Sequence, residues 1–294
     1  MPRAALLSIH ARVAGVRPAT WEHSSLVQLW GPRFNAYVVA AKDLAVFSLG
    51  RLPENVQGRM RAYDTANRLH AVLDGQRLPF GQAGRALGVV PNSLRYATAT
   101  GRVLMRWDGA RQPVIWTVPA PSVDPQHARL ELARRYLHSF GPTTAIAFAD
   151  WAGVRLPEAH AAFESLSREL LAVRTRWVML GYWPMTRRSF EQSRGPQHRA
   201  RLLPSGDTYY LLWGPDRSLL VPDSKHRAKL WTARVWPGAL LIKGEIAGVW
   251  RRAGGEVSIE AWRRLSIVER EAAESEALTL PLPDLDAPIA VRWS

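Results

Sequence analysis

The sequence contains no cysteine. That absence excludes disulfide bonds, thiolate nucleophiles and the common cysteine-based zinc sites. The eight histidines are scattered, and no His-Glu-x-x-His pattern occurs among them, so nothing in the sequence predicts a bound metal. A glycine-rich phosphate-binding loop ending in Gly-Lys-Ser/Thr is also missing, which argues against nucleotide hydrolysis. We therefore expect neither a metal nor a cofactor.

Long hydrophobic runs are missing as well. The most apolar window, residues 34–49, is interrupted by Lys42 and Asp43 and is too short to span a bilayer. The first residues lack the apolar stretch and cleavage site of a signal peptide. These absences predict a cytoplasmic, nucleoid-associated protein that does not bind membranes.

Positive charge is abundant and unevenly distributed. Lysine and arginine number 39 against 25 acidic residues, a formal charge of +14. From Glu256 to the C-terminus there are eight acidic and four basic residues, so the rest of the chain carries 35 basic against 17 acidic residues. Such an excess suits a polyanionic partner, although a GC-rich genome that favours arginine is an alternative explanation. A chain of 294 residues is long enough for two or three small domains.

Residues 79–118 carry the clearest structural pattern. Gln82–Leu87 is periodic like a short helix, Gly88 breaks it, and Pro91–Thr100 is a second helix with proline in its first turn. Extended segments follow on both sides of Asp108-Gly109, a strong hairpin signal. A helix-turn-helix followed by a hairpin is a winged helix.

The second helix of this pattern carries polar side chains that suit a DNA groove. If it lies in a major groove, its side chains can donate to base edges or phosphates, and the candidates are Asn92, Ser93, Arg95 and Tyr96. The helix before this pattern, residues 57–73, is amphipathic, with Met60, Tyr63, Leu69 and Val72 on or near one face.

The same order of elements returns about sixty residues later. One helix ends at Gly141, residues 145–151 form the next, and a longer helix over 157–171 follows the break at Gly153. Two strand-like runs over 172–183 complete a second copy, and repetition is better evidence than either copy alone.

The ends of the chain are less regular. Residues 22–29 are expected to form a helix, 33–41 an extended segment and 42–47 another helix, which together suggest a truncated or degenerate winged helix. After a basic stretch, short strands are expected over 209–213, 218–221, 239–242, 246–252 and 256–260, and a closing helix over 266–278. Such strands suggest a small antiparallel barrel or sheet.

These patterns predict an α+β fold of tandem winged helices with a C-terminal small antiparallel β-barrel. The expected domains are residues 1–55, a truncated first winged helix; 56–120, the second; 121–185, the third; 186–200, a basic linker; and 201–294, the barrel and closing helix.

Three stretches together resemble a known family. They are Leu202-Leu-Pro-Ser-Gly-Asp207, Ala239-Leu-Leu-Ile-Lys-Gly-Glu-Ile-Ala-Gly-Val-Trp-Arg-Arg252 and Arg134-Arg-Tyr-Leu-His-Ser-Phe-Gly-Pro-Thr-Thr144, the last continued by Phe148-Ala-Asp-Trp-Ala-Gly153. In their order they resemble the AlkZ-like (YcaQ-like) winged-helix DNA glycosylases. The resemblance implies three tandem winged helices that clasp duplex DNA, the excision of N7-alkylated or bulky purines and, in some members, the unhooking of interstrand crosslinks.

The family's Gln-x-Gln phrase near the N-terminus matches His10 and Arg12 here. The resemblance therefore implies that these two residues occupy the catalytic positions. His10 can accept a proton or orient water. Arg12 cannot act as a base, and its fixed charge opposes a cationic sugar, but it could grip a phosphate.

The family's Met-Arg-Gly-Thr-x-His phrase aligns roughly with residues 31–37. Arg33 keeps its place and is expected to contact a phosphate. Asn35 or Ala36 stands in the region of the family's threonine, and Tyr37 stands where the family has histidine. The basic run that begins with Arg187 and Arg188 is a further candidate for the DNA backbone. Asp207 and Arg217 match the family's barrel motif and are expected to form a structural ion pair.

Two hypotheses remain open. The first is a monofunctional DNA glycosylase, in which His10 orients water. The second is a non-catalytic DNA-binding relative, a regulator or lesion sensor, that has lost the reaction with its glutamine pair. Both imply a monomer that binds double-stranded DNA, alkylated or crosslinked in the first case.

Overall fold

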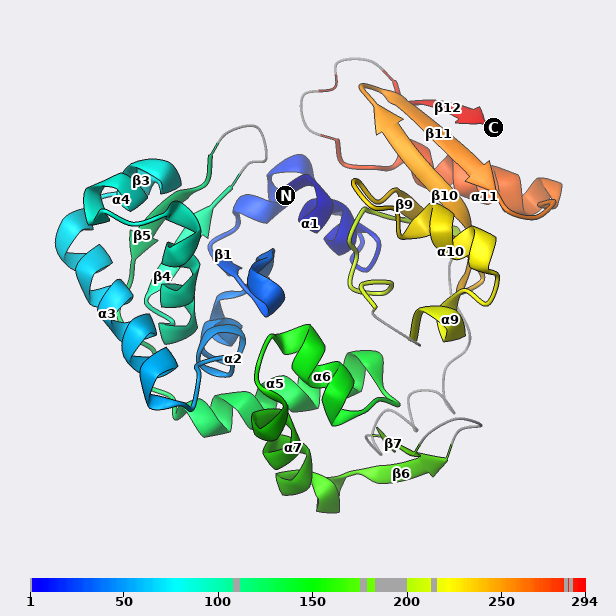
Figure 1. Cartoon of the computed structure of the whole chain (residues 1–294). Helices are drawn as coiled ribbons and strands as arrows, with labels where there is room; N and C mark the ends of the chain where they lie inside the picture. The colour runs from blue at the N-terminus through cyan, green and yellow to red at the C-terminus, as the bar shows by residue number, and fades with distance from the viewer. Residues whose placement is uncertain are drawn as a thin grey trace. The chain divides into compact units, whose positions relative to one another are not determined.

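The structure is a computed structural model, and it describes residues 2–107, 112–174, 179–182, 200–212, 216–282, 285 and 288–294. These residues divide into two compact units by their contacts (Figure 1). The first unit lies within residues 22–191, and the second combines residues 2–21 with residues from 192 onward. Both units mix helices with antiparallel sheet, so the predicted α+β class is confirmed.

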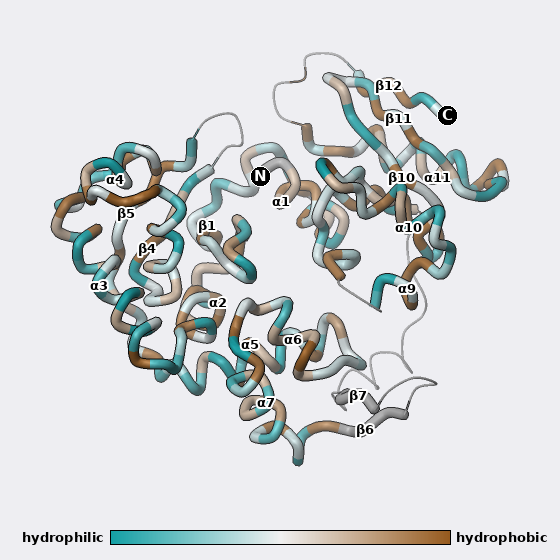
Figure 2. The backbone as a smooth tube through the Cα atoms, viewed as in Figure 1, coloured by the Kyte–Doolittle hydropathy of each residue, from teal (hydrophilic) through white to brown (hydrophobic). Residues whose placement is uncertain are grey.

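The first unit is built on a five-stranded sheet with the order β2-β1-β4-β5-β3. Its strands are β1 (Leu26–Trp30), β2 (Ala36–Ala40), β3 (Leu78–Pro79), β4 (Val103–Arg106) and β5 (Val114–Thr117). The pairing of β4 with β5 confirms the predicted hairpin, although Asp108 and Gly109 lie outside the described residues. Figure 2 marks β5 as hydrophobic, in keeping with the complete burial of Ile115.

The predicted helix over residues 22–29 is wrong. A short 3-10 turn, η1 (Pro18–Glu22), ends there, and β1 follows. Leu29 is fully buried against Val39 of β2 and Leu104 of β4. This short apolar segment fits helix and strand equally well by period, and the neighbouring strands on both sides decide its state.

Helices cover the sheet of the first unit. They are α3 (Val56–Leu73), α4 (Phe80–Leu87) and the 3-10 helix η4 (Pro91–Thr100). The predicted position of η4 is confirmed, but it is 3-10 along its whole length. In α3 the buried residues are Ala62, Ala66, Leu69 and Leu73, so the predicted face is wrong except at Leu69. Small alanines let α3 approach η4 closely.

Several helices follow the β1–β2 hairpin and the β4–β5 hairpin. They are η3 (Ala41–Asp43), α2 (Leu44–Leu49), α5 (Pro125–Phe140), α6 (Ala145–Ala152), α7 (Leu156–Ser165) and η5 (Ser167–Glu169), and the hairpin of β6 (Leu171–Arg174) and β7 (Met179–Tyr182) follows them. The helix ends predicted at Gly141 and Gly153 are confirmed. The predicted helix to Leu171 ends earlier, at Ser165, where one 3-10 turn leads into β6.

The second unit contains a sheet with the order β12-β11-β10-β9-β8. Its strands are β8 (Ala200–Leu203), β9 (Gly238–Ile242), β10 (Glu245–Ala253), β11 (Glu256–Ala261) and β12 (Ala290–Trp293), and only β11 and β12 pair in parallel. The closing helix α11 (Ile267–Leu278) buries Ala273 and Ala277 against this sheet. The strands predicted over 209–213 and 218–221 are wrong: residues 208–210 form a turn, and α9 (Asp216–Leu220) replaces the second strand. A short α10 (Ser224–Leu230) follows.

Helix α1 (Pro2–His10) belongs to the second unit, because Leu7 enters the core formed by β8–β11 and α11. Residues 2–21 and residues 22–55 therefore fall in different units. Winged helices, a closed barrel and their exact boundaries stay predictions. None of the described helices combines the length and the apolar character that crossing a membrane requires.

Candidate active site and nucleic-acid interface

The residues singled out by sequence lie in two places. His10 is the last residue of α1 in the second unit, and Arg12 lies in the turn that follows; with Ser8, Asp207 and Thr279 they form what we call the α1 site. Residues 31–37 and η4 lie in the first unit, and their exposed residues, together with Arg61 of α3, we call the turn surface: Arg33, Asn35, Arg61, Asn92 and Tyr96. Each place is described by itself.

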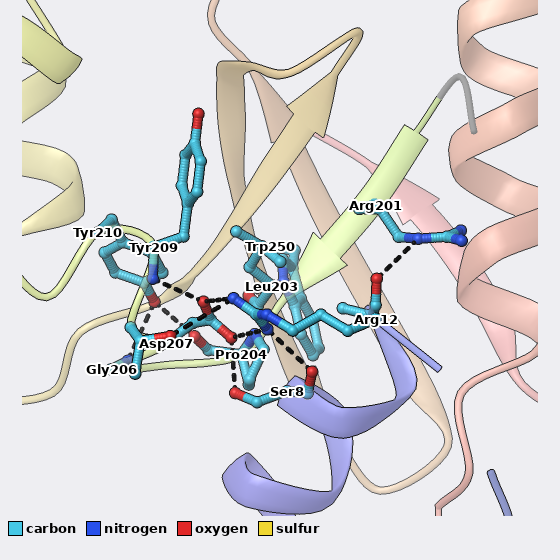
Figure 3. Close-up of polar contacts among 12 residues, drawn as sticks. Ser8, Arg12, Arg201, Leu203, Pro204, Gly206, Asp207, Tyr209, Tyr210 and Trp250 are labelled. Carbon is cyan, nitrogen blue, oxygen red and sulfur yellow. Dashed lines mark hydrogen bonds and ion pairs between the residues drawn. The ribbon is translucent and has the colours of Figure 1, made fainter. Parts of the chain in front are cut away.

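Asp207 is the centre of the α1 site (Figure 3). Arg12 binds it with both ends of its guanidinium: Nη1 lies 2.9 Å from Oδ2 and Nη2 lies 2.7 Å from Oδ1. The Ser8 hydroxyl donates to Oδ2 at 2.6 Å, and the Tyr209 backbone N–H donates to Oδ1 at 2.9 Å. The Asp207 side chain is fully buried, so this bidentate pair compensates a charge that water does not reach.

The loop after β8 holds Asp207 in place. Tyr210 is fully buried, and its hydroxyl lies 2.7 Å from the carbonyl oxygen of Pro204 and 2.8 Å from that of Pro237. That hydroxyl also accepts the N–H of Gly206 at 3.1 Å. Burial raises the pKa of the Tyr210 phenol, so it stays neutral. A rigid loop therefore presents the carboxylate to α1.

The Arg12–Asp207 pair changes the electrostatics expected from the sequence. The carboxylate balances the arginine charge and raises the pKa of Arg12, chiefly through their hydrogen bonds. The predicted ion pair between Asp207 and Arg217 is wrong, because Asp207 pairs with Arg12. Arg217 instead donates from Nε to the Leu212 carbonyl at 2.8 Å and lies over the ring of Trp231.

His10 lies on the other side of the α1 end. Its Nε2 lies 3.2 Å from Thr279 Oγ1, just after α11. Partial burial lowers the pKa of His10; the Glu276 carboxylate opposes this shift and the Arg201 guanidinium adds to it. Those two groups pair with each other at 2.7 Å. The imidazole is therefore neutral at neutral pH, the form that can accept a proton.

Arg201 also ties α1 to the sheet. Its Nε donates to the carbonyl of Ala11 at 3.1 Å, while Nη1 binds Glu276. The Ala11 carbonyl lies at the C-terminal end of α1, where the helix dipole favours a cation. The pair fixes the position of the helix end that carries His10.

The turn surface begins at a strained turn between β1 and β2, within which residues 32–34 form a 3-10 turn, η2 (Pro32–Phe34). Arg33 and Phe34 both have positive φ angles, 55° and 56°, which are unfavourable for residues with a side chain. Gly31 stands where a Cβ would lie 2.8 Å from the Tyr37 ring. Such turns cost about 1–3 kcal/mol per residue and persist where surrounding contacts hold them.

A buried arginine provides those contacts. Arg51 donates from Nε to the Ala152 carbonyl and from Nη1 to the Trp30 carbonyl, both at 2.9 Å, and lies over the Phe34 ring. Burial lowers the pKa of Arg51 to about 10. Arg33 itself is exposed and donates to the Asp150 carbonyl at 3.1 Å. Two arginines therefore bind carbonyls at the C-terminal end of α6, where the helix dipole favours cations.

Tyr37 does not reach the surface with its polar end. Its hydroxyl is buried and has no hydrogen-bond partner among the described residues, and burial raises the pKa of Tyr37 to about 12. Asn35 is exposed at the turn. Within residues 33–37, the exposed residues are thus Arg33 and Asn35.

The turn contacts η4 through aromatic rings. Phe34 meets Tyr96 edge to face, with centroids 5.1 Å apart, and the guanidinium of Arg61 lies 4.2 Å above the Tyr96 ring. Tyr96 is 38% exposed. Arg95 instead lies half-buried over the rings of Trp30 and Phe80. Among the sequence candidates on η4, Asn92 is exposed, Ser93 is half-buried, and Arg95 is used in packing.

Some functional candidates escaped the sequence. Arg61, Arg51 and Thr279 have no local pattern, since each acts through a contact distant in the chain; Thr279 is 269 residues from His10. Arg187 and Arg188 lie outside the described residues. Among the described residues, no group of three histidine or acidic side chains is placed to hold a metal ion.

Comparison with known proteins identifies a matching family and a similar solved structure. The family described as DNA glycosylase AlkZ-like matches residues 1–280. The solved structure of Streptomyces sahachiroi DNA glycosylase AlkZ is similar, with a TM-score of 0.75 and 16% sequence identity over 99% of this chain and 89% of that one. That identity establishes similarity of fold. None of the curated proteins matches the chain.

Proposed function

The chain belongs to the AlkZ-like DNA glycosylase family, and we propose that it binds double-stranded DNA and hydrolyses the N-glycosidic bond of N7-alkylated or otherwise bulky purines. Interstrand crosslinks through a purine N7 belong to the same substrate class. No metal or cofactor takes part in the proposed reaction.

The chemistry asks little of the protein. Alkylation at N7 places a positive charge on the purine, so the bond from the sugar C1′ breaks with its electron pair moving into the base, which leaves neutral. The water oxygen forms the new bond to C1′, and the water gives one proton to a general base of the protein. The protein has to hold the lesion, position the water and tolerate positive charge on the sugar.

The observation that carries the proposal is the pairing of Arg12 with buried Asp207 beside a neutral His10. An unpaired arginine would oppose a cationic sugar. The Asp207 carboxylate compensates that charge. Because both Nη groups of Arg12 are bound to Asp207, Arg12 is a positioning residue for the end of α1. His10 is then the group that accepts the proton of water.

We assign DNA binding in the first unit to the turn surface. Arg33, Asn35 and Asn92 are exposed polar groups, and Arg61 over Tyr96 adds a cation and an aromatic ring. Phosphate contacts by arginine supply affinity without reading sequence. Tyr37 and Arg95 support this surface from below. Ser93, and Arg187 and Arg188 in the basic run, remain proposed contacts.

The proposed architecture has winged helices at α4–η4–β4–β5 and at α6–α7–β6–β7. In both cases two helices separated by a glycine with positive φ, Gly88 or Gly153, precede a hairpin. A closed barrel around β8–β12 and a monomeric state belong to the same proposal.

A non-catalytic DNA-binding protein is the second candidate. It is favoured by the replacement of the family's glutamine pair with His10 and Arg12, of which Arg12 is bound to Asp207. This protein would bind alkylated DNA and leave it intact.

The test is the release of free base from a duplex that contains one N7-methylguanine or one bulkier N7 adduct. We expect release above the spontaneous rate by the wild type and by His127→Ala, which changes an exposed histidine of the first unit. Release at only the spontaneous rate, with binding retained, would favour the second candidate.

A further inference from the structure

The hydrogen bonds of Thr279 determine which nitrogen of His10 carries the proton. Thr279 follows the last turn of α11, and its hydroxyl lies 2.8 Å from the Glu276 carbonyl and 3.2 Å from His10 Nε2. A hydroxyl has one hydrogen to donate and two lone pairs with which to accept. A carbonyl oxygen only accepts, so the shorter contact requires the threonine hydrogen.

The longer contact must then run in the opposite direction. With its hydrogen on the Glu276 carbonyl, the Thr279 oxygen can only accept from His10, so Nε2 carries a hydrogen. Nδ1 of the neutral ring is left with the lone pair, and no described residue forms a hydrogen bond with it. The charged groups that face the ring are Glu276 and Arg201, which pair with each other.

We propose that Thr279 is a positioning residue that holds His10 as the Nε2-protonated tautomer, so that Nδ1 is the atom that accepts the proton of water. This inference rests on the proposed function for the role of the proton, but the tautomer itself does not. The partner of a histidine nitrogen fixes the tautomer and the ring orientation in the same way at other functional sites.

The contact joins distant parts of the second unit. His10 ends α1, and Thr279 ends α11. The Arg201–Glu276 pair lies between the same two helices, since Arg201 also binds the Ala11 carbonyl. The orientation of the His10 ring therefore depends on the Thr279 hydroxyl. A valine at position 279 would match threonine in shape but would have no oxygen to accept the hydrogen bond.

The first measurement is nitrogen NMR of the full chain labelled with ¹⁵N-histidine, in which His10 is assigned by the signal lost in His10→Gln. In a neutral imidazole the protonated and unprotonated nitrogens have well separated shifts. We expect Nε2 to be protonated in the wild type and in Thr279→Ser. Thr279→Val should show a mixture of both tautomers.

Thr232→Val is the matched control. The Thr232 hydroxyl also lies 2.8 Å from a backbone carbonyl, that of Val235, but forms no hydrogen bond with a histidine among the described residues. Its removal should leave the His10 signals unchanged. A wild type protonated on Nδ1, or a Thr279→Val spectrum equal to that of the wild type, would overturn the proposal.

Base release under single-turnover conditions is the second measurement. Thr279→Val should lower the rate about tenfold, the equivalent of one ordinary hydrogen bond, and Thr279→Ser should restore it. Full activity in Thr279→Val would overturn the positioning role. Absence of base release by the wild type, with the expected tautomer observed, would instead overturn the proposed function and leave the Thr279–His10 contact intact.

Discussion

Arg12 and Asp207 illustrate how one buried carboxylate governs the residues around it. The Asp207 side chain is fully buried, whereas that of Arg12 is 44% exposed, so the arginine lies between the carboxylate and the solvent. Ser8 and the Tyr209 N–H satisfy the remaining acceptor positions. If one charge of this pair is removed, the other charge loses its partner and is less well solvated than it would be in water, which destabilises the folded state.

Replacing Asp207 by asparagine should destabilise the protein. We expect Asp207→Asn to lower the free energy of unfolding by about 2 kcal/mol, the usual contribution of hydrogen bonds to a charged group. Urea unfolding measures the change. The control is Asp64→Asn, which breaks an exposed pair with Arg68 at 3.7 Å and should change stability by less than about 0.5 kcal/mol. Equal changes in both variants would show that the Arg12–Asp207 pair is dispensable.

Tyr96 should contribute to DNA binding through its exposed ring. The Tyr96 ring holds the Arg61 guanidinium by a cation–π contact that contributes about 0.5–1 kcal/mol at an exposed site, so Tyr96→Ala should weaken binding to duplex DNA about threefold. Fluorescence anisotropy with a labelled duplex gives the dissociation constant. Tyr63→Ala is the matched control, because Tyr63 is 36% exposed on α3 and Tyr96 is 38% exposed. If the two variants bind equally well, the turn surface does not meet DNA through Tyr96.

At the scale of elements, α11 begins with a well-defined cap. Ser266 and Glu269 form a reciprocal capping box, and Arg263 binds both oxygens of the Glu269 carboxylate. Hydrogen bonds from Arg263, and then from the Ser266 backbone, lower the pKa of Glu269 from 4.5 to about 2. Because α11 carries Glu276 and leads to Thr279, this cap supports the α1 site.

The lowered pKa of Glu269 predicts a particular dependence of stability on pH. A carboxylate with a depressed pKa in the folded state stabilises the protein above its unfolded pKa, and this stabilisation is lost as pH falls through the folded pKa. The stability of the wild type should therefore fall between pH 4.5 and about 2 more steeply than that of Glu269→Gln. Thermal unfolding across this range measures both curves; parallel curves would contradict the assignment.

Sequence patterns located those elements whose ends are marked by glycine or proline. The helices that end at Gly88, Gly141 and Gly153 and the strands β9–β11 follow from such local signals. The state of β1 does not, because its strand neighbours come from β2 and β4. The buried face of α3 could not be predicted from its sequence either, because its alanines are buried through contact with η4.

The same distinction between local signals and distant contacts applies to the candidate site. His10, Arg12 and Arg33 were identified through the family resemblance, which follows chain order. Their partners Thr279, Asp207 and Asp150 lie more than one hundred residues away in the sequence. Among these partners Asp207 and Asp150 stand in phrases that resemble the family, but their contacts with Arg12 and Arg33 required the folded chain.

At the scale of the whole molecule, the charge of +14 should make DNA binding depend on salt. Each phosphate contact contributes a slope of about −0.9 in a plot of log affinity against log salt concentration. We expect a steep slope for the wild type and a slope shallower by about one unit for Arg33→Gln. Arg68→Gln is the control, because Arg68 binds the Leu87 carbonyl and Asp64. A nearly flat slope for the wild type would contradict both candidate functions.

The central claim is that His10 is the base of a DNA glycosylase. The most direct measurement is the single-turnover rate of base release from duplex N7-methylguanine as a function of pH, for the wild type and His10→Ala, with the spontaneous rate subtracted. Since the pKa of His10 is lowered from 6.5, the wild-type rate should rise with pH below 6.5 and be level above it, and His10→Ala should be slower by about a hundredfold or more without that rise. Release by His10→Ala at the wild-type rate, or none by the wild type, would contradict the account.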